Sequence, residues 1–159
     1  MGSHRITSLD EITIMVNNTR NLSAYSGTPP PQEQGDRHIA DGPLYHVADV
    51  LAVLDQGEAA LVPWTRKCKD DLLRLALEVS DAQALVREAL EHGCYRNSEW
   101  CVQQPSGPWA ACDAYQLWHN EWVQAAYKEM CFEYYIKFAI GKSGKLLLLV
   151  SCHEPQDRG

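Results

Sequence analysis

Residues 132–140 constrain the fold most, because every second side chain there is large and apolar. One face would carry only apolar side chains, and the other would carry Glu133, Tyr135 and Lys137. A period of two is typical of a β-strand that buries one face. A Gly-Lys-Ser-Gly turn follows, and the segment 145–153 after it is apolar on both faces, which predicts a hairpin to a central strand.

Apolar side chains recur at helical spacing in three earlier segments, and two more segments have strand character. The predicted helices are 47–54, 72–79 and 81–90, the last with Ser80 and Gln83 as a capping box. The predicted strands are 94–102 and 109–118, whereas 120–128 fits either a helical turn or a loop. Helices followed by antiparallel strands predict an α+β domain, in which the N-terminal helices pack on one face of an antiparallel β-sheet.

Residues 1–44 differ in composition from the rest of the chain. They contain three consecutive prolines, several turns rich in Gly and Asn, and few apolar side chains. A segment of this kind buries little surface. We therefore expect a flexible or partly ordered N-terminal arm at 1–44, an α+β domain at 45–153 and a frayed tail at 154–159. Deletion of residues 1–40 is then expected to leave a folded domain.

The net charge and the spacing of the cysteines disfavour several classes of protein. The chain has 14 Lys and Arg against 21 Asp and Glu, a net charge of −7, whereas a protein that coats nucleic acid is expected to be basic. No apolar run approaches the roughly 20 residues of a membrane helix, and no secretory leader is evident. Six cysteines without a Cys-x-x-Cys pair disfavour structural zinc. We expect a cytoplasmic protein with reduced cysteines and no membrane contact, metal or cofactor.

The predicted open face of the sheet brings phenols and cations together. It carries Tyr135 and Lys137, and Tyr95 and Arg96 would join them if their strand belongs to the same sheet. Such groups suit RNA cleavage without metal, which needs a base for the 2′-hydroxyl, an acid for the leaving oxygen and a cation for the phosphorane. A solvated face with cationic stems packed on aromatic rings fits the same pattern. His153 would close the last strand beside this group.

An ordered set of short motifs resembles the MqsR family of bacterial toxins. The motifs are Cys-Tyr-Arg-Asn-Ser at 94–98, Trp109 followed by Asp-Ala-Tyr at 113–115, Tyr-Ile-Lys at 135–137 and Leu-Leu-Leu-Val-Ser at 147–151. The family has Phe-Tyr-Lys-Ser, Trp-Gln-Asp-Val-Tyr, Tyr-hydrophobic-Lys and Val-Ser-Phe segments in the same order. The resemblance covers about residues 45–153 and implies a RelE-like microbial ribonuclease fold.

That resemblance implies a metal-independent mRNA endoribonuclease of a type II toxin–antitoxin system, which a partner antitoxin holds inactive. Cleavage would proceed by attack of the RNA 2′-hydroxyl. Lys137 and Arg96 would stabilise the phosphorane, Tyr135 would position or shuttle a proton, and Tyr95 would hold a base. The other expected site residues, which would bind substrate, are Tyr115, Asp113 and His153.

Two differences from the family pattern leave a second function open. Arg96 stands where the family has lysine, which keeps the charge but removes a proton donor, and Cys112 stands where the family has glutamine. The alternative is a non-catalytic module of the same fold that binds a protein partner. A positive patch around Arg96 and Lys137 would favour the nuclease, and a flat aromatic and acidic face would favour the module.

Overall fold

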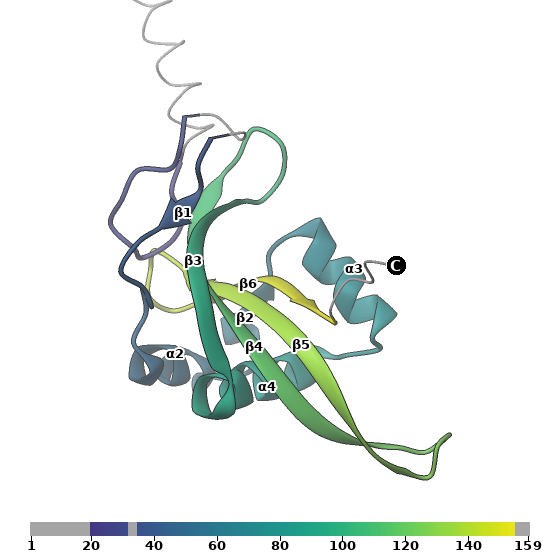
Figure 1. Cartoon of the computed structure of the whole chain (residues 1–159). Coiled ribbons are helices and arrows are strands. Elements are labelled where there is room, and N and C mark those ends of the chain that lie inside the picture. The colour runs from purple at the N-terminus through teal and green to yellow at the C-terminus, as the bar shows by residue number, and fades with distance from the viewer. Residues whose placement is uncertain (1–19, 32–34, 155–159) are drawn as a thin grey trace, which may run out of the picture.

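The computed structural model describes residues 20–31 and 35–154, which form one six-stranded sheet with helices packed against it (Figure 1). The elements, in chain order, are β1 (His38–Ile39), α2 (Val47–Leu54), a 3₁₀ turn (Glu58–Ala60), β2 (Leu61–Pro63), α3 (Arg66–Arg74), α4 (Val79–His92), β3 (Cys94–Val102), β4 (Trp109–Val123), β5 (Lys128–Ile140) and β6 (Leu147–His153). The strand order is β1-β3-β4-β5-β6-β2. Neither these helices nor any other part of the described ranges offers a helix long and apolar enough to span a membrane.

The α+β class is confirmed, with one difference in the sheet. Neighbouring strands are antiparallel except for β2, a short edge strand that runs parallel to β6. This strand follows the first helix and was not expected from the sequence, because three residues are too few to show a period. Its presence on the outer side of β6 makes β6 an inner strand, as its apolar sequence predicts.

The helices cover the sheet face that carries Tyr115, Ile136 and Cys152. These three residues are paired across β4, β5 and β6 and are buried. Helix α4 packs on β4 and helix α3 on β6, while α2 contacts α4 and β6. The core between the helices and this face extends past the sheet to Ala110 and Cys112, which alternate along β4 onto the opposite face, where Tyr135 and Lys137 also lie.

The predicted helices are correct at 47–54 and 81–90 and misplaced at 72–79. Helix α3 begins at Arg66 because Thr65 caps it, its hydroxyl accepting the Cys68 N–H at 3.0 Å. It ends before Ala76, whose φ of 55° breaks the helix. The capping pair of α4 is also not the predicted one, since the Asp81 carboxylate accepts the N–H of Glu78 at 2.8 Å.

Strands β4 and β5 extend well beyond their neighbours. The segment 120–128, left open between a helical turn and a loop, continues β4 to Val123 and then turns into β5. Residues 117–134 pair only β4 with β5 within the described chain, because β3 begins opposite Gln116 and β6 ends opposite Tyr135. We call this two-stranded projection the hairpin arm (Figure 1).

Part of the segment before Tyr45 also contacts the sheet. Residues 21 and 23 bridge to Trp109 and Gly141, and β1 pairs with β3 at one edge of the sheet. Backbone N–H groups in this segment therefore bond to the sheet and not to water. The composition of this segment, which is typical of a linker, could not predict these contacts, because most of them are made by the backbone. The expectations for residues 1–19 and for the tail from 155 onward lie outside the described residues.

The sheet is strongly coiled. Gln103, just after β3, donates its side-chain N–H to the backbone oxygen of Trp64, just after β2, at 2.9 Å. These two residues follow strands near opposite edges of the sheet. Coiling of this kind makes the face that carries Lys137 concave at the end of the sheet where β3 leads into β4.

Candidate functional site

A β-bulge in β3 determines which side chains reach the face not covered by helices. The pairing of β3 with β4 shifts between Tyr95 and Asn97, so Arg96 is the additional residue. The bulge sends the exposed Arg96 side chain to the uncovered face, where its Nε donates to the Gln116 side chain at 2.6 Å. Tyr95 consequently points to the opposite, helix-covered face.

Arg96 belongs to a group of side chains that we call the polar cluster, composed of Arg96, Gln116, Glu133, Tyr135 and His153. Gln116 connects it, because its oxygen accepts from Arg96 and its nitrogen donates to Glu133 and to the Tyr135 hydroxyl. The Tyr135 hydroxyl also donates to the Glu133 carboxylate at 3.1 Å. The cluster thus holds a cation, a carboxylate and a phenol within one network.

His153 completes the polar cluster from β6. It pairs with Tyr135 across the sheet, and the two ring centroids are 5.8 Å apart. Its Nδ1 lies 2.7 Å from the backbone oxygen of Glu154, which suits Nδ1–H as the donor. In that tautomer Nε2 carries the lone pair and is able to accept a proton.

Lys137 lies on the same face but is engaged with a carboxylate. Its ammonium group forms an ion pair with Glu99 of β3, and only 26% of the lysine side chain is exposed. Burial lowers the pKa of Lys137, but the neighbouring Cys101 thiol, together with the hydrogen bond and the negative charge of Glu99, outweighs it and raises the pKa overall. Lys137 is therefore a fixed cation near neutral pH and does not release a proton there.

Tyr95, Asp113 and Tyr115, three of the expected site residues, lie on the helix-covered face. Asp113 is fully buried and accepts the backbone N–H groups of Leu44 and Tyr45 and the hydroxyl of Ser98. Side chains placed there cannot meet a ligand that lies on the face of Lys137. In this structure Asp113 holds the segment before α2, and the structure does not bring it together with Lys137.

The two tyrosines of this group are also engaged in packing. Tyr115 is 5% exposed and stacks on Phe138, and burial raises its pKa to about 12. The Tyr95 hydroxyl bonds to Ser98 at 2.7 Å, and Gly42 sits so close that a β-carbon there would lie 2.0 Å from that oxygen. The backbone around Gly42 thus covers the Tyr95 hydroxyl, which does not face the polar cluster.

Gln116 and Glu99 are site residues that the sequence reasoning missed. Strand alternation from Ala114 would have placed Gln116 on the face of Lys137, beside Tyr135 on the next strand. The partner of Lys137 could not be found this way, because Glu99 lies two strands away and its register depends on the bulge.

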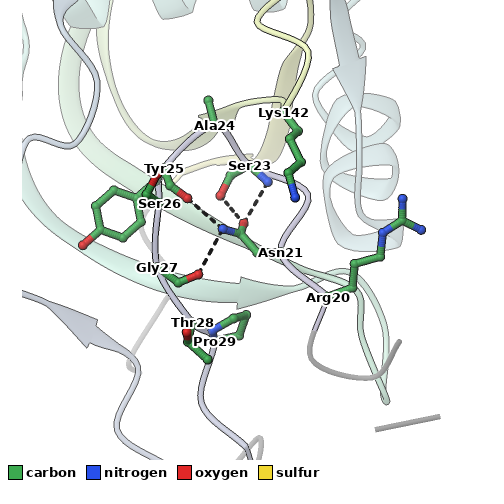
Figure 2. Close-up of a pocket in the computed structure, with 10 residues that line it drawn as sticks. All are labelled: Arg20, Asn21, Ser23, Ala24, Tyr25, Ser26, Gly27, Thr28, Pro29 and Lys142. Carbon is green, nitrogen blue, oxygen red and sulfur yellow. Dashed lines mark hydrogen bonds between the residues drawn. The ribbon is translucent and has the colours of Figure 1, made fainter. Parts of the chain in front are cut away.

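A pocket of about 400 Å³ lies elsewhere, between residues 20–29 and Lys142 (Figure 2). Figure 2 shows Asn21 in its interior, where the amide donates to the backbone oxygen of Tyr25 and accepts from Ser23. None of the expected site residues lines it. Among residues 20–31 and 35–154, no three His, Cys, Asp or Glu side chains gather in a group that could hold a metal ion.

Comparison of the chain with protein-family models, with curated proteins and with solved structures finds no match. The interpretation of the polar cluster and of the Lys137–Glu99 pair therefore depends on the contacts and chemistry of these side chains alone.

Proposed function

We propose that the protein is a metal-independent endoribonuclease whose reacting groups come from the polar cluster. The observation that carries this proposal is the convergence of Arg96, Tyr135 and His153 on the uncovered sheet face. The motif resemblance to MqsR toxins, with their RelE-like fold, supports the same activity. On that resemblance the natural substrate is mRNA and the natural inhibitor an antitoxin protein.

Each group of the cluster has a chemical role in this reaction. His153 Nε2 takes the proton of the RNA 2′-hydroxyl, and the resulting oxygen attacks the adjacent phosphorus. Arg96, exposed and oriented by Gln116, stabilises the charge that develops on the phosphorane. Tyr135, hydrogen bonded to Glu133 and Gln116, gives a proton to the departing 5′-oxygen. The products are a 2′,3′-cyclic phosphate and a free 5′-hydroxyl.

The charge balance of this face favours a second candidate function. Arg96 and Lys137 are matched by Glu133 and Glu99, so the face is not a positive patch. A non-catalytic protein-binding module would have no need of unpaired cations. This candidate gains further support from the exposed aromatic side chains of the hairpin arm.

The nuclease is tested with the purified full-length chain, a long RNA and excess EDTA, followed by mapping of the 5′ ends. We expect defined cuts with 5′-hydroxyl ends, and no cut where the nucleotide before the break is a 2′-deoxynucleotide. Arg96→Ala should lower the rate by about 10²–10³, the usual loss when one stabilising donor is removed. Arg66→Ala is the matched control, because the Arg66 side chain is 89% exposed on α3.

Two results would contradict the proposal. One is cleavage that EDTA abolishes and a divalent ion restores. The other is an Arg96→Ala variant that cuts as fast as the wild type and the Arg66→Ala control. If no RNA is cut under any condition, the protein-binding module becomes the better account of this face.

A further inference from the structure

The hairpin arm exposes more aromatic surface than any other described element. Trp118 is 51% exposed, Trp122 is 54% exposed and Tyr127 at the turn is 76% exposed. The Trp122 and Tyr127 rings meet edge to face, with centroids 5.4 Å apart. An isolated two-stranded hairpin is marginally stable in water, so aromatic side chains left open on one are typical of a contact surface.

Strand alternation places both tryptophans on one face of the arm. This is the face that also carries the polar cluster, because Trp118 and Trp122 are two and six residues beyond Gln116 on β4 without a register shift. Glu133 lies directly opposite Trp118 and Glu129 lies directly opposite Trp122. The surface thus repeats a unit of one indole ring and one carboxylate, at a spacing of about 13 Å for four residues of strand. Glu133 also accepts from Gln116 and Tyr135, but both bonds go to Oε1, and an ionised carboxylate can accept further donors at its other oxygen.

The other face of the arm is already occupied. The His119 ring lies against the Glu88 carboxylate of α4, and within the arm the Tyr134 hydroxyl donates to Glu121 at 2.8 Å. The first of these contacts connects this face of the arm to the helix layer. The tryptophan face is the one that remains open to a partner in the described structure.

We propose that the tryptophan face of the hairpin arm docks an extended protein segment that carries two arginine side chains four residues apart. A guanidinium group stacks on an indole ring and pairs with the adjacent carboxylate, so each Trp–Glu unit fits one arginine. In an extended segment, side chains four residues apart lie on the same face and match the spacing of the two units. The inference does not rest on the proposed RNA cleavage.

The charge of the arm favours a basic protein segment over a nucleic acid. Residues 117–134 carry Glu121, Glu129 and Glu133 against Lys128. Single-stranded RNA also stacks on aromatic side chains, but it needs cations along its phosphates. Carboxylates beside both indole rings would repel those phosphates and attract guanidinium groups.

The test uses a fluorescein-labelled 11-residue peptide with Arg at positions 4 and 8 and Thr elsewhere, and measures its anisotropy with the full-length protein. We expect binding that falls with added salt, and at least five-fold weaker binding for a peptide with Gln at both positions. Trp118→Ala and Trp122→Ala should each weaken binding at least five-fold, and Glu129→Gln at least two-fold. Leu73→Ala is the matched control, since Leu73 is 80% exposed on α3.

Every other outcome overturns the proposal, provided that the variants keep the wild-type circular dichroism spectrum. If the peptide does not bind, or binds equally well to both tryptophan variants, the face is not a basic-segment site. If a labelled oligouridine binds through the tryptophans and the peptide does not, the face is a stacking surface for RNA. Because no RNA is present in the peptide assay and none of these variants alters Arg96, Tyr135 or His153, failure of the nuclease and failure of the docking site are distinguishable.

Discussion

At the scale of single residues, Asp113 shows how a buried carboxylate can hold two parts of the chain together. Its oxygens accept the N–H groups of Leu44 at 2.9 Å and Tyr45 at 3.1 Å, and the Ser98 hydroxyl at 2.6 Å. Removing the carboxylate would leave these buried donors without an acceptor. We therefore expect Asp113→Ala to lower the free energy of unfolding by about 3–5 kcal/mol in urea denaturation.

The conservative variant separates a structural role from a functional one. Asp113→Asn keeps one acceptor oxygen and should lose less stability than Asp113→Ala. If Asp113→Ala were as stable as the wild type but unable to cut RNA, the result would support the substrate contact expected from the sequence.

Lys137 behaves differently from the exposed lysine that strand alternation suggests. Alternation alone predicts that Lys137→Ala costs under about 0.5 kcal/mol, the usual effect of a surface substitution. Because Lys137 is half-buried against Glu99, the variant leaves a carboxylate without its partner. We expect a loss of about 1–3 kcal/mol in urea denaturation.

A double variant tests whether the stability lost in Lys137→Ala comes from the unpaired Glu99 carboxylate. Adding Glu99→Gln to Lys137→Ala removes the unpaired charge and should recover much of the lost stability. Equal stability of the wild type and Lys137→Ala would mean that the ion pair contributes nothing.

The face of each strand residue could be predicted except where the strand is irregular. In β5 the alternation correctly separates Tyr135 and Lys137 from the core. In β3 a single additional residue at Arg96 exchanges the faces of everything before it, which moves Tyr95 away from the candidate site. No local pattern marks that bulge, so the sequence alone could not separate Tyr95 from the face of Arg96.

At the scale of elements, strong helical spacing located α2 and α4 but not α3. The apolar pattern over 72–79 predicts a helix there, yet the Thr65 cap and the break at Ala76 move α3 toward the N-terminus. The length of β4 and β5 was also missed, because the polar segment between them has no partner strand to bury an apolar face. Contacts between elements, and not propensity, set these boundaries.

The contact between α3 and β6 predicts how stability depends on pH. Burial, together with nearby negative charges, raises the pKa of Cys68 on α3 and of Cys152 on β6 from 9.0 to about 12. The unfolded chain therefore releases these protons near pH 9, while the folded chain holds them to about pH 12. The stability from both thiols is complete below pH 9 and falls as the pH rises from 9 to 12.

The slope of that loss is measurable. Each thiol contributes up to about 1.4 kcal/mol per pH unit within this window. Urea denaturation at pH 8.5, 9.5 and 10, with reductant present, should show a smaller slope for Cys152→Ala than for the wild type. A free energy of unfolding that stays constant from pH 8.5 to 10 would mean that the thiols are not held protonated by the fold.

At the scale of the whole molecule, the N-terminal segment closes one side of the sheet. A second small core forms under it, where Ile39 packs with Trp100, Trp109 and Ala111. Trp109 is 2% exposed, and the guanidinium group of Arg37 lies 5.1 Å from the centre of its ring. The coiled sheet and this segment together enclose side chains that the sheet and helices alone would leave in water.

Removing residues 20–44 should therefore unfold much more than an arm. The deletion takes away the N–H of Leu22 bonded to Trp109 at 2.9 Å and the N–H of Ala24 bonded to Ile140 at 2.8 Å. It also exposes two tryptophan side chains, each worth about 1.5–3 kcal/mol when buried. At roughly 2–4 °C per kcal/mol for a domain near this size, a chain that starts at residue 45 should melt more than 10 °C below one that starts at residue 20.

Comparing those two chains removes residues 1–19 from both, so the difference in melting temperature belongs to 20–44 alone. Linker-like composition predicts a small shift, whereas the hydrogen bonds to Trp109 and Ile140 and the tryptophan burial predict a large one. Gly42→Ala gives the same contrast without a deletion, since its new β-carbon would collide with the Tyr95 hydroxyl and displace this segment locally. If the melting temperature shifts by less than 2 °C in both experiments, residues 20–44 contribute little to the stability of the domain. The bonds from Asp113 to Leu44 and Tyr45 would then contribute little as well.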